Sequence, residues 1–253
     1  MASIKTLLIT QARTGSTRLP GKVLLKVNDN ELLKIHLERL KKSKLVDQII
    51  VATTINKEDD VIISLCEKWG FRTSRGAVDD VLDRYYQTAN KIKPEWVVRA
   101  TSDCPLIDPG MVDAVVAFAQ LNEVDYCSNT LIENFPNGQD VEVFKFSALK
   151  KAWKEAKLKS EREHVTPYIK KHSSHNDGTL FSAVNFPCQY NFHDIRMTVD
   201  LPVDFELMQK LILDLGIDQS WLTYTNHIID NQLHQLTANI IRNEGLLKSL
   251  KND

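Results

Sequence analysis

Short apolar runs alternate with helix-patterned segments through the first hundred residues, and this alternation constrains the fold more than any other feature. The spacing predicts strands at 4–11, 48–53, 71–74 and 96–100, and helices at 31–42, 58–69 and 78–92. Strands that are apolar along most of their length are typical of a mostly parallel sheet covered by helices on both faces. We therefore expect an α/β fold with a Rossmann-like sheet.

The second half of the chain has a less regular pattern. It predicts helices at 111–120, 147–157, 160–171 and 202–215, and strands at 125–128, 140–146, 180–186 and 195–199. Pro167 is expected to kink or interrupt the third of these helices. From about residue 231 the pattern is that of an amphipathic helix. The whole chain, 1–253, is expected to be a single domain in which the antiparallel-looking segment 126–186 forms a small inserted dimerisation arm.

The balance of charge limits the classes of partner. Lys plus Arg number 32 and Asp plus Glu number 33, which argues against a general nucleic-acid binder. The four cysteines are scattered and form no Cys-x-x-Cys pair, so a zinc site is not expected. Their pattern instead predicts a reduced, cytoplasmic protein. No apolar stretch approaches the length of a membrane span, and the N-terminal run fits a strand better than a signal peptide.

A basic loop of small residues follows the first predicted strand. It carries three cations, Arg13, Arg18 and Lys22, around the run Gly15-Ser16-Thr17. Backbone N–H groups of such a loop can approach a phosphate closely, and the cations can neutralise its charge. The loop is not a Walker A motif, because its glycine spacing differs and Val23 follows the lysine. A solvated surface turn is the alternative, but three cations directly after the first strand favour a triphosphate site.

Two aspartates end predicted strands. Asp103 follows the strand at 96–100, and Asp200 follows the run 195–199. Asp108, directly before Pro109, is the better N-cap for the next helix and leaves Asp103 without a structural role. Asp200 could instead cap the helix that begins at Pro202. Because Mg²⁺ binds one or two carboxylates together with substrate phosphates, the pair suggests a magnesium site.

Two further charged sets give weaker indications. The first comprises Arg75, Asp79, Asp80 and Arg84, and salt bridges along a helix face would explain it. The second is the run from Glu161 to His164, in which Arg162 and His164 would matter only for a substrate that carries a carboxylate.

Six separated motifs resemble the bacterial sugar-acid cytidylyltransferases, the CMP-Kdo and CMP-sialate synthetases, and above all their spore coat polysaccharide biosynthesis protein F subgroup. The main motif is Arg13-x-x-Ser-Thr-Arg-Leu-Pro-Gly-Lys22. The others are Arg75-Gly76 with Asp80-Val-Leu-Asp-Arg-Tyr85, Asp103-Cys-Pro-Leu-Ile-Asp108, Asp140-Val-Glu-Val-Phe144, Ser160-Glu-Arg-Glu-His-Val165, and Val199-Asp200 before Pro202. The resemblance covers residues 4–210 and implies a fold of the nucleotide-diphospho-sugar transferase type.

The resemblance also implies an activity. The hydroxyl of an acidic sugar, of the 2-keto-3-deoxy or nonulosonic type, would attack the α-phosphorus of CTP and release pyrophosphate, for a surface polysaccharide. It implies Mg²⁺ as cofactor and a homodimer, with neither a nucleic acid nor a membrane as partner. Charge neutralisation and positioning are the main requirements of such a displacement.

The resemblance implies roles for individual residues. Arg13, Arg18, Lys22 and Asp103 would be catalytic, and Asp103 and Asp200 would bind the metal. The nucleotide-binding residues would be Ala12, Arg13, Gly15, Ser16, Thr17, Arg18, Lys22, Arg75, Thr101 and Ser102. The residues that bind the sugar would be Gln139, Glu142, Arg162 and His164.

Three other functions stay open from the sequence. The first is a nucleotidyltransferase that uses another triphosphate or a sugar-phosphate acceptor. The second is a glycosyltransferase, although Ser102-Asp103-Cys104 lacks the Asp-x-Asp motif usual in those enzymes. The third is a nucleotide-binding regulator, which would not need a second metal ligand such as Asp200.

Overall fold

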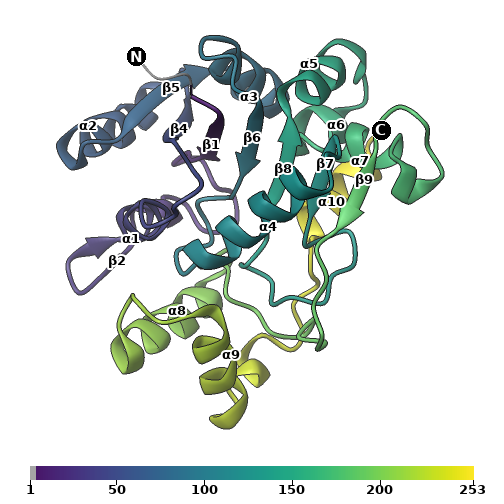
Figure 1. Cartoon of the computed structure of the whole chain (residues 1–253). Helices are drawn as coiled ribbons and strands as arrows, with labels where there is room; N and C mark the ends of the chain where they lie inside the picture. The colour runs from purple at the N-terminus through teal and green to yellow at the C-terminus, as the bar shows by residue number, and fades with distance from the viewer. Residues whose placement is uncertain (1–3) are drawn as a thin grey trace.

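A seven-stranded sheet forms the centre of the molecule in the computed structural model, which describes residues 4–253 (Figure 1). Its strands lie in the order β5-β4-β1-β6-β8-β7-β9. Their bounds are β1 (Thr6–Gln11), β4 (Gln48–Thr54), β5 (Arg72–Gly76), β6 (Trp96–Arg99), β7 (Tyr126–Ser128), β8 (Glu142–Lys145) and β9 (Ala183–Asn185). Only β8 runs antiparallel to its neighbours in this sheet. The predicted mostly parallel sheet is therefore confirmed.

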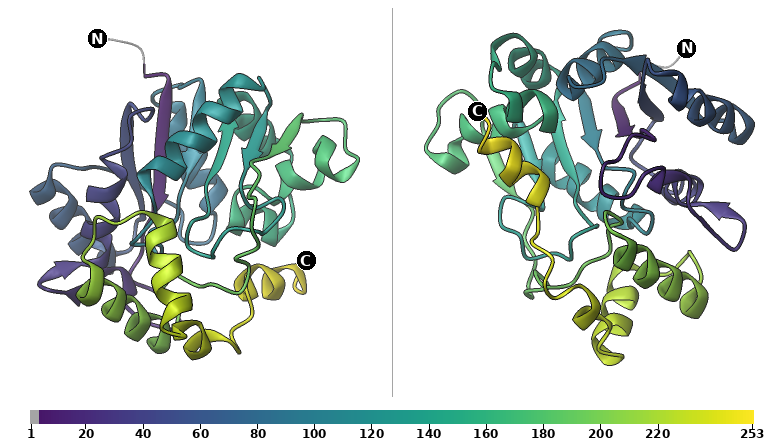
Figure 2. Two further views of the ribbon diagram at one scale, coloured as in Figure 1. Left: turned by 60° about the horizontal axis from the view of Figure 1, so that its bottom comes forward. Right: turned by 180° about the vertical axis from the view of Figure 1, so that it is seen from behind.

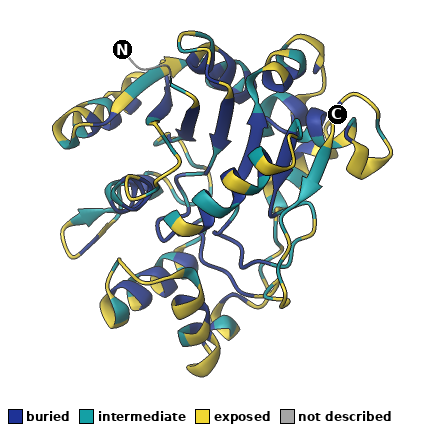
Figure 3. Ribbon diagram, in the orientation of Figure 1, coloured by how far each residue is buried: buried dark blue, intermediate teal, exposed yellow. Residues whose placement is uncertain are grey.

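Helices cover both faces of the sheet, as the continuous apolar strands predict (Figures 1 and 3). The helices on one face are α1 (Leu32–Leu40), α2 (Asp60–Trp69) and α4 (Pro109–Leu121), and those on the other are α3 (Val81–Asn90) and α5 (Phe146–Glu155). Alternate residues of β1 point to opposite faces, so Leu8 packs with α4 while Leu7 and Ile9 pack with α3.

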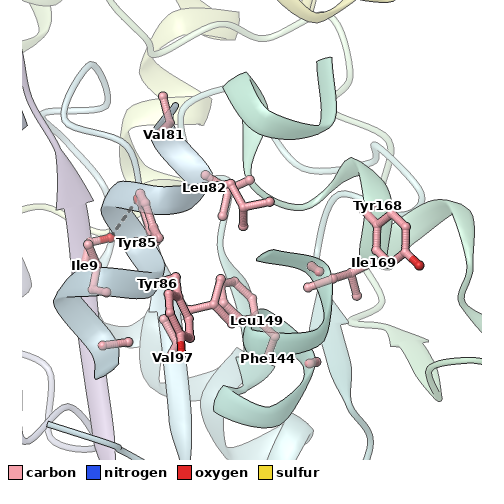
Figure 4. Close-up of a cluster of buried hydrophobic side chains, with 14 of the residues drawn as sticks. Ile9, Val81, Leu82, Tyr85, Tyr86, Val97, Phe144, Leu149, Tyr168 and Ile169 are labelled. Carbon is pink, nitrogen blue, oxygen red and sulfur yellow. Dashed lines mark hydrogen bonds between the residues drawn. The ribbon is translucent and has the colours of Figure 1, made fainter. Parts of the chain in front are cut away.

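The core on the α3 side fixes that helix against the sheet (Figure 4). Tyr85 of α3 is fully buried, and its hydroxyl donates a hydrogen bond of 3.0 Å to the carbonyl of Ile9. Leu82, Phe144 and Leu149 fill the space around it. Each such side chain stabilises the fold by about 1.5–3 kcal/mol. As a result, α3 begins at a fixed point beside the carboxyl end of the sheet.

A separate helical layer lies below the sheet in Figure 1. It consists of α8 (Pro202–Leu215) and α9 (Trp221–Asp230), which pack with α1 and with the extended segment 195–199. The last helix, α10 (Glu244–Leu250), runs away from this layer and lies beside α6 (Lys159–His164) (Figure 2). The remaining elements are the hairpin β2 (Lys26–Val27) and β3 (Asn30–Glu31), the helix α7 (Pro167–Lys171), and the 3₁₀ turns η1 (Lys22–Leu24), η2 (Lys57–Asp59), η3 (Ser174–Asn176) and η4 (Leu233–Thr237).

Two predictions for the second half are wrong, and one is confirmed in detail. Residues 195–199 form no strand of the sheet: they make a single isolated bridge, between Arg196 and Asn137. Their strand-like pattern arises because Ile195, Met197 and Val199 alternate into the core of α8 and α9. The predicted interruption of the helix 160–171 at Pro167 is confirmed, because the segment forms two helices, α6 and α7, and Pro167 starts the second one. The C-terminal pattern is a 3₁₀ turn and the short helix α10 instead of one long helix.

The segment 126–186 is an integral part of the sheet. It supplies β7, β8 and β9, and its helix α5 packs in the same core as α3. Pairing with a second copy through this segment stays a prediction. Across residues 4–253, no helix combines the length and the apolar character that crossing a bilayer requires.

Candidate active site

A cleft of about 810 Å³ lies where β1 and β6 end. Ligands of open α/β sheets bind at this edge, because the loops that follow parallel strands meet there. The cleft brings together most of the residues that the sequence singled out: Ala12, Arg13, Ser16, Thr17, Arg18, Lys22, Thr101, Ser102, Asp103, His164 and Asp200. The expected convergence of the basic loop and the two aspartates is thus observed.

The basic loop after β1 is held in one conformation by a buried carboxylate. Asp59 accepts hydrogen bonds from the backbone N–H and the hydroxyl of Thr14, at 2.7 and 2.8 Å. Burial would raise the pKa of Asp59, but the hydrogen bonds from Thr54 and Thr14 outweigh it and lower that pKa. The N–H of Gly21 in turn donates to the carbonyl of Thr14 at 2.9 Å, which closes the loop on itself. The cations of the loop therefore project from a rigid base.

Lys22 lies between the two aspartates. Its Nζ is 2.9 Å from Oδ2 of Asp103 and 2.7 Å from Oδ1 of Asp200. Burial alone would raise the pKa of Asp103, but the charge of Lys22 and hydrogen bonds from Thr101 and Lys22 hold it below its usual range. Burial would lower the pKa of Lys22, and the two carboxylates raise it instead. Two carboxylates thus converge on one cation in the cleft.

Asp200 is positioned by the backbone and by arginines. The N–H of Val199 donates to the carbonyl of Asp103 at 2.7 Å, which joins the two aspartate segments directly. Arg196 contacts Asp200 at 3.1 Å and is itself fixed by Asp204 at 2.8 Å. Asp204, rather than Asp200, is the acidic residue that accepts the backbone N–H groups at the start of α8. Asp200 is therefore free of the capping role that was its alternative.

Close approach of two backbones supports this arrangement. Gly138 has φ of +105°, and a Cβ built there would lie 2.4 Å from the carbonyl oxygen of Met197. Only glycine adopts such a position readily. Gly138 therefore allows the segment that carries Asp200 to lie against the loop before β8.

A neutral histidine, His36, is hydrogen-bonded to the residue that follows Asp103. His36 is fully buried, and burial lowers its pKa to about 4. Its Nδ1 donates to the carbonyl of Cys104 at 2.9 Å, so its Nε2 accepts from the hydroxyl of Thr10 at 3.0 Å. This chain of hydrogen bonds fixes the end of β6 relative to β1.

A second cavity, of about 760 Å³, shares Arg99, Asp140 and His164 with the first. Glu142 lies at its base and pairs with Arg99 and, at 3.0 Å, with Lys170. Burial acts to raise the pKa of Glu142, but the charges of Lys170 and Arg99 outweigh it and lower that pKa well below its usual range. Burial lowers the pKa of His164, so its imidazole is neutral near pH 7. The carboxylate of Glu142 is thus occupied by ion pairs with Arg99 and Lys170, and it holds these two cations in place.

Three predicted site residues have structural roles instead, and Gly15 is not among the residues that line the cleft. Arg75 turns away and donates to the carbonyl of Thr54 at 2.9 Å, which ties β5 to the end of β4. Gln139 is fully buried and accepts the N–H of Asp108 at 2.9 Å. Arg162 pairs with Asp80, the N-cap of α3, at 3.0 Å. These polar side chains satisfy buried backbone or capping groups, which a linear motif cannot reveal.

Several cleft residues escaped prediction. Arg84 and Arg99 belong to a helix and a strand that the sequence identified, but charge alone did not mark them as facing the cleft. The explanation of Arg84 by helix-face salt bridges is wrong, since its neighbours Asp80 and Arg75 pair elsewhere. Helix α10 also lines the cleft, and its Glu244 pairs with Arg18 at 3.0 Å. No local pattern connects a C-terminal helix with the first loop.

Residues 7–241 match the family model described as cytidylyltransferase. The chain belongs to the cytidylyltransferase family. It is 46% identical over 205 residues to an uncharacterised protein of Methanocaldococcus jannaschii, covering 80% of this chain and 81% of that protein. It is 34% identical over 215 residues to the spore coat polysaccharide biosynthesis protein SpsF of Bacillus subtilis, covering 83% of this chain and 87% of SpsF.

A solved structure of a cytidylyltransferase from Leptospira borgpetersenii superimposes with a TM-score of 0.85 at 32% identity, covering 94% of this chain and 98% of that chain. The resemblance to sugar-acid cytidylyltransferases of the SpsF subgroup is thereby confirmed. The Rossmann-like fold and the assignment as a nucleotidyltransferase are confirmed as well.

Proposed function

We propose that this cytidylyltransferase transfers CMP from CTP to an acidic sugar and releases pyrophosphate. The observation that carries the proposal is the meeting of Asp103, Lys22 and Asp200 in one cleft, beside the cations of the β1 loop. A triphosphate carries several negative charges, and its displacement needs them neutralised and held in line. Arg13, Arg18 and Lys22 supply positive charge on one side of the cleft.

We propose Mg²⁺ as the cofactor, held by Asp103 and Asp200. Their carboxylate oxygens both approach a single cation, the Lys22 ammonium, and this convergence supports the proposal. Residues 4–253 contain no group of three or more acidic, histidine or cysteine side chains that could hold a metal. Two carboxylates suit Mg²⁺, since its other ligands are water and substrate phosphates. When bound, Mg²⁺ would neutralise phosphate charge and lower the pKa of an attacking hydroxyl.

The second cavity suits the acceptor sugar. Arg99, Lys170 and His164 line it, and Arg99 and His164 also face the first cleft. A carboxylate on the sugar would meet the cations Arg99 and Lys170, and His164 could donate a hydrogen bond to it. The oxygen of the sugar hydroxyl would then form a bond to the α-phosphorus of CTP. The bond from that phosphorus to the oxygen that bridges the α and β phosphates would break, and pyrophosphate would leave. Lys22 and Arg18 would hold the triphosphate in place during this exchange.

The test is pyrophosphate release with CTP, ATP, GTP and UTP, each combined with 2-keto sugar acids and with sugar phosphates. We expect release with CTP and at least one sugar acid, dependent on Mg²⁺. Release only with sugar phosphates would contradict the proposal that the acceptor is an acidic sugar. Release with another triphosphate would contradict the proposal that the enzyme uses CTP. Transfer of sugar from a nucleotide sugar would favour the glycosyltransferase alternative.

We also propose a role in surface polysaccharide synthesis and a homodimer. The name of SpsF, a spore coat polysaccharide biosynthesis protein, supports the first part. Deleting the gene and analysing the surface sugars tests the role, because loss of one acidic sugar is expected. Light scattering tests the dimer, and a monomer at working concentration would contradict it.

A further inference from the structure

Arg84 is a buried cation that forms no ion pair within residues 4–253. It lies in the first turns of α3, its side chain lines the cleft, and only 2% of the residue is exposed. Its Nε and NH1 are buried and make no hydrogen bond within residues 4–253. None of the ion pairs in this part of the chain includes it. A buried guanidinium costs free energy unless a partner satisfies it, which indicates that a ligand does so.

The strand before α3 is shaped to hold this arginine. A Cβ at Gly76 would lie 2.5 Å from Cγ of Arg84, so the absence of a side chain there makes room for it. Burial lowers the pKa of Arg84, and the charge of Arg13 adds to this effect, while Tyr85, Asp59 and Asp80 act against it without forming an ion pair with Arg84. Arg75, on the same strand, cannot take its place, because it is bonded to Thr54 and Asp60 away from the cleft.

The cleft that Arg84 lines contains both apolar and charged side chains. Ala12, Val78 and Val81 supply apolar surface to this cleft, and the exposed carboxylate of Asp79 lines it as well. The same cleft also contains the cations Arg99 and Lys159, which suit a negatively charged group. An apolar wall with one set of donors and one acceptor suits a planar base that hydrogen-bonds at its edge.

We infer that Arg84 and Asp79 recognise the cytosine of CTP, with Arg84 donating to its O2 and N3 and Asp79 accepting from its amino group. This inference rests on the proposed use of CTP. Cytosine presents two acceptors followed by one donor along this edge. One guanidinium and one carboxylate complement that pattern, in the way that arginine and acidic side chains read base edges in nucleic acids.

The same pair rejects uracil. In UTP, N3 carries a hydrogen that would face the Arg84 donors, and O4 replaces the amino group and would face the Asp79 carboxylate. Two unfavourable contacts then replace two favourable ones. A neutral amide at position 79 could instead donate to O4, so Asp79→Asn should remove part of the discrimination.

The experiment is calorimetric binding of CTP and of UTP with Mg²⁺ to the full chain, which needs no acceptor. We expect the unaltered protein to bind CTP more tightly than UTP. In Arg84→Gln, CTP binding should weaken roughly 10- to 100-fold while UTP binding changes little. In Asp79→Asn, the ratio of the two affinities should fall by about tenfold, mainly through tighter UTP binding.

A matched control and the contrary outcomes make the test decisive. Arg72→Gln, on the exposed side of β5, should leave both affinities unchanged. Equal weakening of CTP and UTP in Arg84→Gln would place Arg84 on the phosphates and overturn the inference, as would equal binding by the unaltered protein. If Arg84→Gln fails to fold, Asp79→Asn, at an exposed position, still decides the question. Failure of the proposed function would appear separately, as absent pyrophosphate release from a protein that discriminates CTP from UTP.

Discussion

Glu244 of the C-terminal helix pairs with Arg18 of the first loop at 3.0 Å, across 226 residues of sequence. Arg18 also contacts Asp200 at 3.1 Å. Two carboxylates thus surround a cation that is proposed to bind the triphosphate, so α10 and the nucleotide compete for the same side chain.

Glu244→Gln is expected to tighten CTP binding roughly twofold to fivefold, because removing a partly exposed ion pair leaves Arg18 free for phosphate. Titration calorimetry with CTP and Mg²⁺ measures the change. Glu67→Gln, on the exposed surface of α2, is the matched control and should have no effect. Weaker CTP binding in Glu244→Gln would mean that α10 helps to hold the nucleotide.

Asp103→Asn and Asp200→Asn are each expected to lower kcat/KM by roughly a hundredfold or more, because each would remove one anionic metal ligand. Melting temperatures should stay close to that of the unaltered protein, since both residues lie in an open cleft. Pyrophosphate release measured over a range of Mg²⁺ concentrations checks this. A variant that keeps full activity would exclude its residue from the metal site.

Glu142→Gln is expected to destabilise the fold by about 3–5 kcal/mol at pH 7, because it leaves Arg99 and Lys170 without their buried partner. The lowered pKa of Glu142 in the folded state means that its contribution is present above the pKa of the unfolded chain and is lost as pH falls. Urea unfolding between pH 7 and pH 3 should therefore show a shallower loss of stability in the variant. Identical pH profiles would contradict the pairing.

Gly138→Ala is expected to destabilise the fold by about 2 kcal/mol or more and to weaken Mg²⁺-dependent activity. The methyl group would require a strained φ and would displace the segment that carries Asp200. Urea unfolding and kcat/KM measure the two effects. Gly15→Ala is the control for stability, because a methyl group there meets no atom within 4 Å. Unchanged stability in Gly138→Ala would show that the loop adapts.

The sequence predicted the elements whose pattern is local. The helical period of α1, α2 and α4 arises because one face of each helix is buried. The strands are continuously apolar because both faces of the sheet are buried, and both patterns can be read directly from the order of the residues. Arg13, Lys22 and Asp103 were found for a related reason. Each belongs to a loop at the carboxyl end of a strand, and in a parallel sheet such loops must meet.

What the sequence could not predict depends on contacts between distant segments. Residues 195–199 alternate like a strand, but a helical layer, not a sheet, buries their apolar side chains. Arg75 and Arg84 are both arginines near the end of β5, and only the bond from Arg75 to Thr54 shows which one leaves the cleft. The ion pair between Glu244 and Arg18 cannot be predicted from the sequence pattern around either residue.

The far end of the chain also bears on how the protein should be handled. Asp253 accepts the backbone N–H of Ser160 in α6 at 2.8 Å, so the final residues lie on the helix that ends at His164. A purification tag fused after Asp253 would begin at this contact and pull on α10. A tag at the N-terminus is the better choice, because β1 begins at Thr6 and reaches the cleft only at its carboxyl end, at Gln11.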